Sequence, residues 1–144
     1  MKKLILTFTV CSIIISCKKS LPATNACNVD KTTIAGIYKV TSIKYKTSGG
    51  AAETDGMANM QDCQRDDTYE LKSDGTVMIS EATNDCGLPP PPVLPNSWSL
   101  ESSNTILVMG ANLNIVSFNC SSLVVEEKNL MVDGDIKTTT YEKP

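Results

Sequence analysis

The chain contains no histidine among its 144 residues, and its aromatic residues are limited to one tryptophan, two phenylalanines and four tyrosines. Without imidazole, the usual general base of nucleophilic catalysis and a common metal ligand are missing. No CxxC pair occurs, and Ser48-Gly49-Gly50 is a flexible turn rather than a phosphate-binding loop. These absences predict a protein that is not an enzyme, with no catalytic residues, no metal site and no cofactor.

Three pairs of carboxylates remain as candidates for acid–base chemistry, which needs two carboxyl groups in one cleft. Glu126-Glu127 are neighbours on a predicted strand and therefore point to opposite faces. Asp133 and Asp135 flank a turn glycine, which is typical of hairpin turns. Asp66-Asp67 lack the regular spacing of a calcium loop, so we expect a solvated or loop-capping role for them.

No apolar run reaches the roughly 20 residues that a membrane-spanning helix needs. Lys2 and Lys3 precede an uncharged run over 4–16, whose length suits the core of a signal peptide. The run ends in Ile14-Ile15-Ser16-Cys17, which resembles the bacterial lipobox. We therefore expect residues 1–16, with Cys11, to be removed as a signal peptide. Cys17 would then carry diacylglycerol and an added acyl chain such as palmitate, enough chains for stable membrane anchoring.

The remaining 128 residues, 144 less the 16 of the signal, suffice for one domain with a modest core. Lys18-Lys19 follow the lipidated cysteine, whereas surface-exported lipoproteins of Bacteroidetes tend to carry acidic residues there. This resemblance indicates the cell envelope, with the anchor on the periplasmic face of the outer membrane. Beyond Ser20 the chain holds 16 acidic residues against 9 basic ones, a net charge near −7. This charge argues against nucleic-acid binding.

Four cysteines remain after Cys11 and Cys17, and in an exported protein an even number predicts two disulfides. Sequence alone allows three ways of pairing Cys27, Cys63, Cys86 and Cys120. We favour Cys63–Cys86, because a hairpin between these residues would bring their ends together, which leaves Cys27–Cys120.

Alternating apolar and polar residues predict an all-β domain. Polar residues 17–33 form the lipidated N-terminus and a tether that becomes ordered near Cys27, and the domain occupies 34–144. Ser73-Asp74-Gly75 predicts a hairpin whose buried face carries Tyr69, Leu71, Val77 and Ile79. The eight predicted strands cover Ile37–Tyr45, Asp67–Lys72, Thr76–Glu81, Ser97–Glu101, Thr105–Met109, Leu113–Phe118, Leu123–Val132 and Ile136–Glu142. Short connections favour an up-and-down barrel, which leaves no open edges, with a β-sandwich as the alternative.

Several segments, in this order and spacing, resemble the lipocalin-like domain of small Bacteroidetes lipoproteins. They are Ile34–Val40, Cys63–Leu71, Ser73–Thr76, Cys86, Ser97–Leu100 and Thr139–Lys143. The first strand has Gly36-Ile37-Tyr38 where this family usually has Gly-x-Trp, and the Pro-rich segment is not a family feature. The resemblance covers most of the domain and implies a small antiparallel barrel that binds a small ligand.

Two functions are consistent with these features. In the first, the barrel binds a small apolar or amphipathic ligand at its mouth. The candidate lining residues are Tyr38, Met78, Trp98, Met109 and Phe118, and for each of them the alternative, which we favour, is ordinary barrel core. In the second, the domain is an interaction or inhibitor module for an envelope protein, which it contacts through the loop over 48–62 and the Pro-rich segment over 88–95.

Overall fold

A computed structural model describes residues 27–50, 52–81, 86–87 and 96–144. The helical elements are α1 (Lys31–Ile34), the 3-10 helix η1 (Met57–Asn59) and α2 (Asp62–Arg65). The strands are β1 (Gly36–Lys46), β2 (Thr54–Asp55), β3 (Thr68–Leu71), β4 (Val77–Ser80), β5 (Trp98–Ser102), β6 (Thr105–Val108), β7 (Ala111–Phe118), β8 (Ser122–Lys128) and β9 (Ile136–Glu142).

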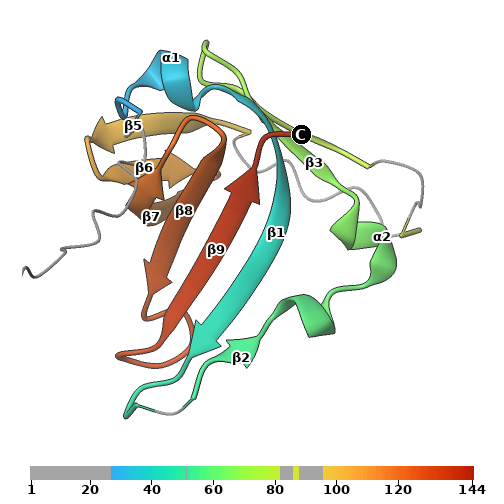
Figure 1. The fold of residues 1–144 in the computed structure, drawn as a ribbon, viewed down its shortest axis with the longest axis vertical. Coiled ribbons are helices and arrows are strands. Elements are labelled where there is room, and N and C mark those ends of the chain that lie inside the picture. The colour runs from blue at the N-terminus through green and yellow to red at the C-terminus, as the bar shows by residue number, and fades with distance from the viewer. Residues whose placement is uncertain (1–26, 51, 82–85, 88–95) are drawn as a thin grey trace, which may run out of the picture.

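Eight strands form one antiparallel sheet that curls into a nearly closed barrel, in the order β4-β3-β1-β9-β8-β7-β6-β5 (Figure 1). The short β2 pairs with β1, and β4 and β5 are the two outer strands. All other strands that are neighbours in sequence are neighbours in the sheet, and β9 returns to β1. The predicted all-β, lipocalin-like up-and-down barrel is confirmed. Because all strands share one curled sheet, the β-sandwich alternative is wrong.

The two outer strands of this sheet meet at the seam between β4 and β5. Thr76 and Ser97 form an isolated antiparallel bridge. Next to it, the N–H of Val77 donates to the carbonyl of Asn96 at 2.8 Å, and the N–H of Trp98 donates to that of Gly75 at 2.7 Å. The predicted Pro-rich segment, 88–95, lies outside the described residues.

The predicted hairpin is formed by β3 and β4. In its turn, the carboxylate of Asp74 accepts a hydrogen bond from the N–H of Thr76 at 2.8 Å, and Gly75 has a φ of +96° that favours glycine. Leu71 and Val77 are buried as expected. Ile79 is opposite Tyr69 in the register but is 41% exposed, because it lies near the end of β4, an outer strand of the sheet.

The end of the strand predicted over Leu123–Val132 needs a correction. The apolar residues Leu130, Met131 and Val132 were expected to extend β8, but β8 ends at Lys128. Asn129 has a φ of +58°, and the carboxylate of Asp135 accepts hydrogen bonds from the backbone N–H groups of all three apolar residues. The side chain of Asp135 thus accepts the hydrogen bonds of backbone N–H groups that would otherwise continue the strand pairing.

One end of the barrel is closed by α1 and the chain before it (Figure 1). Asp30 caps α1, because its carboxylate accepts from the N–H groups of Thr32 at 2.9 Å and Thr33 at 2.8 Å. Ile34 is fully buried and joins a core that contains Tyr38, Ile106 and Val77. Residues 27–33, at the end of the predicted tether, thus lie against the barrel. The end of the barrel that α1 covers is the closed end. The opposite end, with Met109-Gly110 and the 129–135 turn, is the mouth.

Both predicted disulfides are present. Cys27–Cys120 joins the chain before α1 to the β7–β8 turn, and its Cα atoms are 5.3 Å apart. Cys63–Cys86 links α2 to the chain after β4, also with Cα atoms 5.3 Å apart. The first bridge attaches residue 27 to the β7–β8 turn at the closed end, and the second attaches α2 to Cys86.

Candidate functional site

A cavity of about 170 Å³ lies at the mouth, inside the barrel. Its walls come from β3, the β6–β7 hairpin, β8 and β9, all strands whose inward-facing residues alternate with outward-facing ones. The lining residues are Tyr69, Val108, Met109, Ala111, Leu113, Val125, Glu127, Lys137, Thr139 and Tyr141.

A smaller cavity of about 30 Å³ lies deeper in the barrel. It shares Tyr69, Val108, Leu113, Val125 and Tyr141 with the larger cavity, so the two adjoin. Its remaining walls are apolar or aromatic: Tyr38, Leu71, Val77, Ile106 and Leu123. Together, the two cavities form a cup that is narrow and apolar at its base and wider at the mouth.

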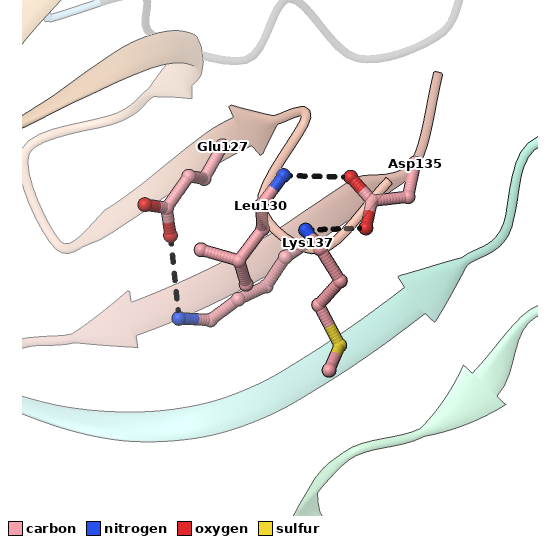
Figure 2. A network of polar contacts seen from close by, with 5 residues as sticks. Glu127, Leu130, Asp135 and Lys137 are labelled. Carbon is pink, nitrogen blue, oxygen red and sulfur yellow. Dashed lines mark hydrogen bonds and ion pairs between the residues drawn. The ribbon is translucent and has the colours of Figure 1, made fainter. Parts of the chain in front are cut away.

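The polarity of the cup rises toward the mouth along β8 and β9. Successive inward-facing cross-strand pairs, from the closed end outward, are Leu123–Tyr141, Val125–Thr139 and Glu127–Lys137. The ammonium of Lys137 lies 3.5 Å from the carboxylate of Glu127 (Figure 2). Their side chains are 28% and 23% exposed, respectively, so water reaches the pair but does not surround it.

Three tyrosines pack edge to face at the base of the cup. The ring of Tyr141 lies 6.5 Å from that of Tyr38 and 5.9 Å from that of Tyr69. Burial raises the pKa of Tyr141 to about 12, and Tyr69 and the carboxylate of Glu127 add to this shift. Burial likewise raises the pKa of Tyr38 to about 12. These phenols are neutral near pH 7 and present uncharged rings to the cup.

Two of the five candidate lining residues from the sequence line this cup: Tyr38 at its base and Met109 at its mouth. Met78 does not, since it lies on the outer face of β4 and is 43% exposed. Strand alternation could have excluded it, because its neighbour Val77 faces inward.

Trp98 and Phe118 are buried but line neither cavity of the cup. The indole N–H of Trp98 donates to the carbonyl of Lys72 at 2.7 Å, and the ammonium of Lys31 lies 5.6 Å from its ring. The ammonium of Lys143 lies 5.8 Å from the Phe118 ring. Both aromatic residues therefore hold the closed end together.

The polar pair at the mouth was not predicted from the sequence. The rule that Glu126 and Glu127 point to opposite faces is confirmed, since Glu127 lines the cup and Glu126 does not. The sequence does not say which of the two faces inward. The sequence also gives no indication that Glu127 and Lys137 are in contact, because that contact depends on the β8–β9 register.

The carboxylates at the start of β3 differ from expectation. One oxygen of Asp67 is buried and accepts no hydrogen bond from the described residues. Burial raises the pKa of Asp67, and the neighbouring Asp66 raises it further. Within the described ranges no three Asp, Glu, Cys or His side chains cluster as a metal site would require.

The predicted long loop over 48–62 is partly structured. Its β2 pairs with β1, and the N–H of Gly56 donates to the carbonyl of Ile43 at 2.8 Å. The guanidinium of Arg65, in α2, donates to the carbonyl of Met57 at 2.9 Å, and this hydrogen bond connects α2 to η1. A solvent-open groove of about 530 Å³ lies between this segment and β1. It is lined by Thr41, Ser42, Lys44, Glu53, Thr54, Asp55 and Met57.

No protein-family model, curated protein or solved structure matches the chain in comparisons with known proteins. In the part of the chain that the structure describes, no helix is long and apolar enough to cross a membrane.

Proposed function

We propose that this protein is a lipid-anchored lipoprotein of the bacterial cell envelope whose barrel binds a small apolar or amphipathic ligand without catalysing a reaction. The cup at the mouth carries this proposal. A cavity of about 170 Å³ with mainly apolar walls opens at one end of a barrel whose other end is closed. The proposed membership of the lipocalin-like lipoproteins agrees with this role, and it rests on the motifs named above.

The dimensions of the cup limit the ligand. An apolar cavity of about 150 Å³ holds one benzene molecule, whereas pockets for drug-sized ligands reach about 300–1,000 Å³. The proposed ligand therefore has an apolar body about as large as one aromatic ring or a short branched alkyl chain. Long-chain lipids and multi-ring cofactors are too large for this cup.

Titration with ethylbenzene, followed by two-dimensional NMR of the isotope-labelled domain, tests ligand binding. We expect the largest shifts at methyl groups of Val108, Leu113 and Val125, which line both cavities. A Leu113→Phe variant should fill the cup and weaken binding at least tenfold. Val116→Phe is the matched control, because Val116 is on the outer face of the same strand and is 51% exposed. Ethylbenzene shifts that Leu113→Phe leaves unchanged would contradict the proposal, as would the absence of shifts with both ethylbenzene and its amphipathic analogues.

The membrane anchor has its own test. The mature protein extracted from membranes should begin at Cys17 and carry the mass of a diacylglycerol and an additional acyl chain. A Cys17→Ala variant should lose metabolic labelling with palmitate. An intact Met1 terminus, or an unmodified Cys17 at the mature terminus, would contradict the anchor without affecting the ligand proposal.

The groove beside the 48–62 segment supports a second candidate function, an interaction module for an envelope protein. Its charged edge includes Lys44 and Glu53, whose ammonium and carboxylate lie 3.7 Å apart. A Glu53→Lys/Asp55→Lys variant should lose any partner recovered in a pull-down from envelope extract. If the variant and the parent protein recover the same partners in equal amounts, this candidate function loses its support.

A further inference from the structure

The cup contains one ion pair in an otherwise mainly apolar wall, formed by Glu127 and Lys137. The contact of 3.5 Å is the one hydrogen bond that either side chain makes within the described residues. An ammonium has three N–H donors and a carboxylate can accept about four hydrogen bonds. Both groups therefore retain hydrogen-bonding capacity toward the cavity.

The two charges together limit the head group that the mouth accepts. A ligand with only a carboxylate would gain Lys137 but meet the negative charge of Glu127. A ligand with only an amine would gain Glu127 but meet the ammonium of Lys137. Like charges in a partly buried site are repulsive and act against such ligands. A head group with a cation and an anion side by side satisfies both residues and keeps the mouth electrically neutral.

The ion pair also has a fixed place relative to the apolar walls. Glu127 and Lys137 are cross-strand partners, and the next inward pair toward the closed end is Val125 and Thr139. A ligand whose head group meets the ion pair would therefore direct its apolar body toward the base of the cup. The two cavities, of about 170 and 30 Å³, accommodate one ring or a branched alkyl group there.

We propose that the ligand is a small zwitterion with an apolar side chain, of the class of the hydrophobic α-amino acids. Its carboxylate binds Lys137, its ammonium binds Glu127, and its side chain occupies the apolar part of the cup. This inference rests on the proposed function, because it specifies the ligand of the same cavity.

A matched ligand series tests the inference on the unaltered domain by calorimetry and NMR. L-Phenylalanine carries both charges, 3-phenylpropanoate lacks the amine, phenethylamine lacks the carboxylate, and ethylbenzene lacks both. We expect phenylalanine to bind at least about tenfold more tightly than any of the other three, because only phenylalanine forms hydrogen bonds with both charged residues. If ethylbenzene binds as tightly as phenylalanine, the inference is wrong and the proposed function stands. If none of the four binds, both are wrong.

Two variants give a second readout that a purely structural role would not produce. Lys137→Met leaves Glu127 alone at the mouth, so phenethylamine should become the preferred ligand. Glu127→Gln leaves Lys137 alone, so 3-phenylpropanoate should become preferred. The control is Lys44→Met/Glu53→Gln, which removes an ion pair of similar length on the outer face. An unchanged order of preference in both cup variants, or the same change in the control, would overturn the inference.

Discussion

The two disulfides differ in the length of chain that they close, and this difference predicts how much each one stabilises the fold. Cys27–Cys120 spans 93 residues in sequence and Cys63–Cys86 spans 23. A cross-link stabilises mainly by lowering the entropy of the unfolded chain, and the effect grows with loop length. The chain-entropy relation gives about 4.7 kcal/mol for the long loop and about 3.4 kcal/mol for the short one.

We therefore expect a Cys27→Ala/Cys120→Ala variant to lose about 1 kcal/mol more than a Cys63→Ala/Cys86→Ala variant. Urea denaturation of both variants and the parent protein measures this difference. Because the effect acts on the unfolded state, the dependence of the unfolding free energy on urea should also steepen more for the first variant. An equal or larger loss in the second variant would refute this reasoning and indicate that local contacts determine the contribution of each bridge.

Three further predictions follow from particular side chains. The pKa values of Tyr38 and Tyr141 are both raised to about 12, so the folded state retains protons that the unfolded state releases above pH 10. The contribution of these two phenols to the free energy of unfolding should therefore be fully present below pH 10 and be lost between pH 10 and 12. Tyrosinate absorbance checks this, and ionisation of all four phenols near pH 10 would contradict it. Gly56→Ala should destabilise the fold by about 1–3 kcal/mol in thermal unfolding, because the added Cβ would lie 2.5 Å from a methyl group of Ile43; an unchanged midpoint would argue against this close packing. Asp135→Ala should accelerate hydrogen exchange at the three amides of the 130–132 turn that its carboxylate accepts from, and unchanged exchange there would show that this carboxylate does not hold the turn.

The barrel could be predicted from the sequence because its signals are local. Alternation fixes a strand wherever one face is buried, and Asp74-Gly75 specifies the β3–β4 turn. All eight predicted strands are present, and both disulfides follow from the even number of cysteines and the expected hairpin. The strand predicted over Leu123–Val132 is too long, which shows the limit of this signal. The apolar run 130–132 has strand composition, but Asp135 binds its backbone from a later position in the chain.

The closed end could be predicted less well, since it depends on contacts between distant parts of the chain. α1 has only four residues, too few for a helical period. The ammonium of Lys143 donates to the carbonyls of Thr33 at 2.9 Å and Ala35 at 3.1 Å, across more than 100 residues of sequence. It also lies 5.2 Å from the ring of Tyr38. No local pattern indicates such contacts.

The cup shows a different limit. Alternation divides the residues of a strand between two faces, but it does not give their depth along the barrel. Trp98 and Phe118 were candidates for lining the cup, yet both lie at the closed end. Glu127 and Lys137 meet at the mouth because the register of β8 and β9 places them opposite one another. Residue type alone therefore identified Tyr38, but it also included two aromatic residues outside the cup and missed the ion pair.

The central claim is that the barrel interior is open at its mouth and apolar within. A crystal of the domain held under xenon tests it most directly, because xenon enters apolar cavities of this size. We predict a xenon site between Val108, Leu113 and Val125, in the region shared by the two cavities. An interior filled by side chains, with no xenon within reach of these three residues, would contradict it.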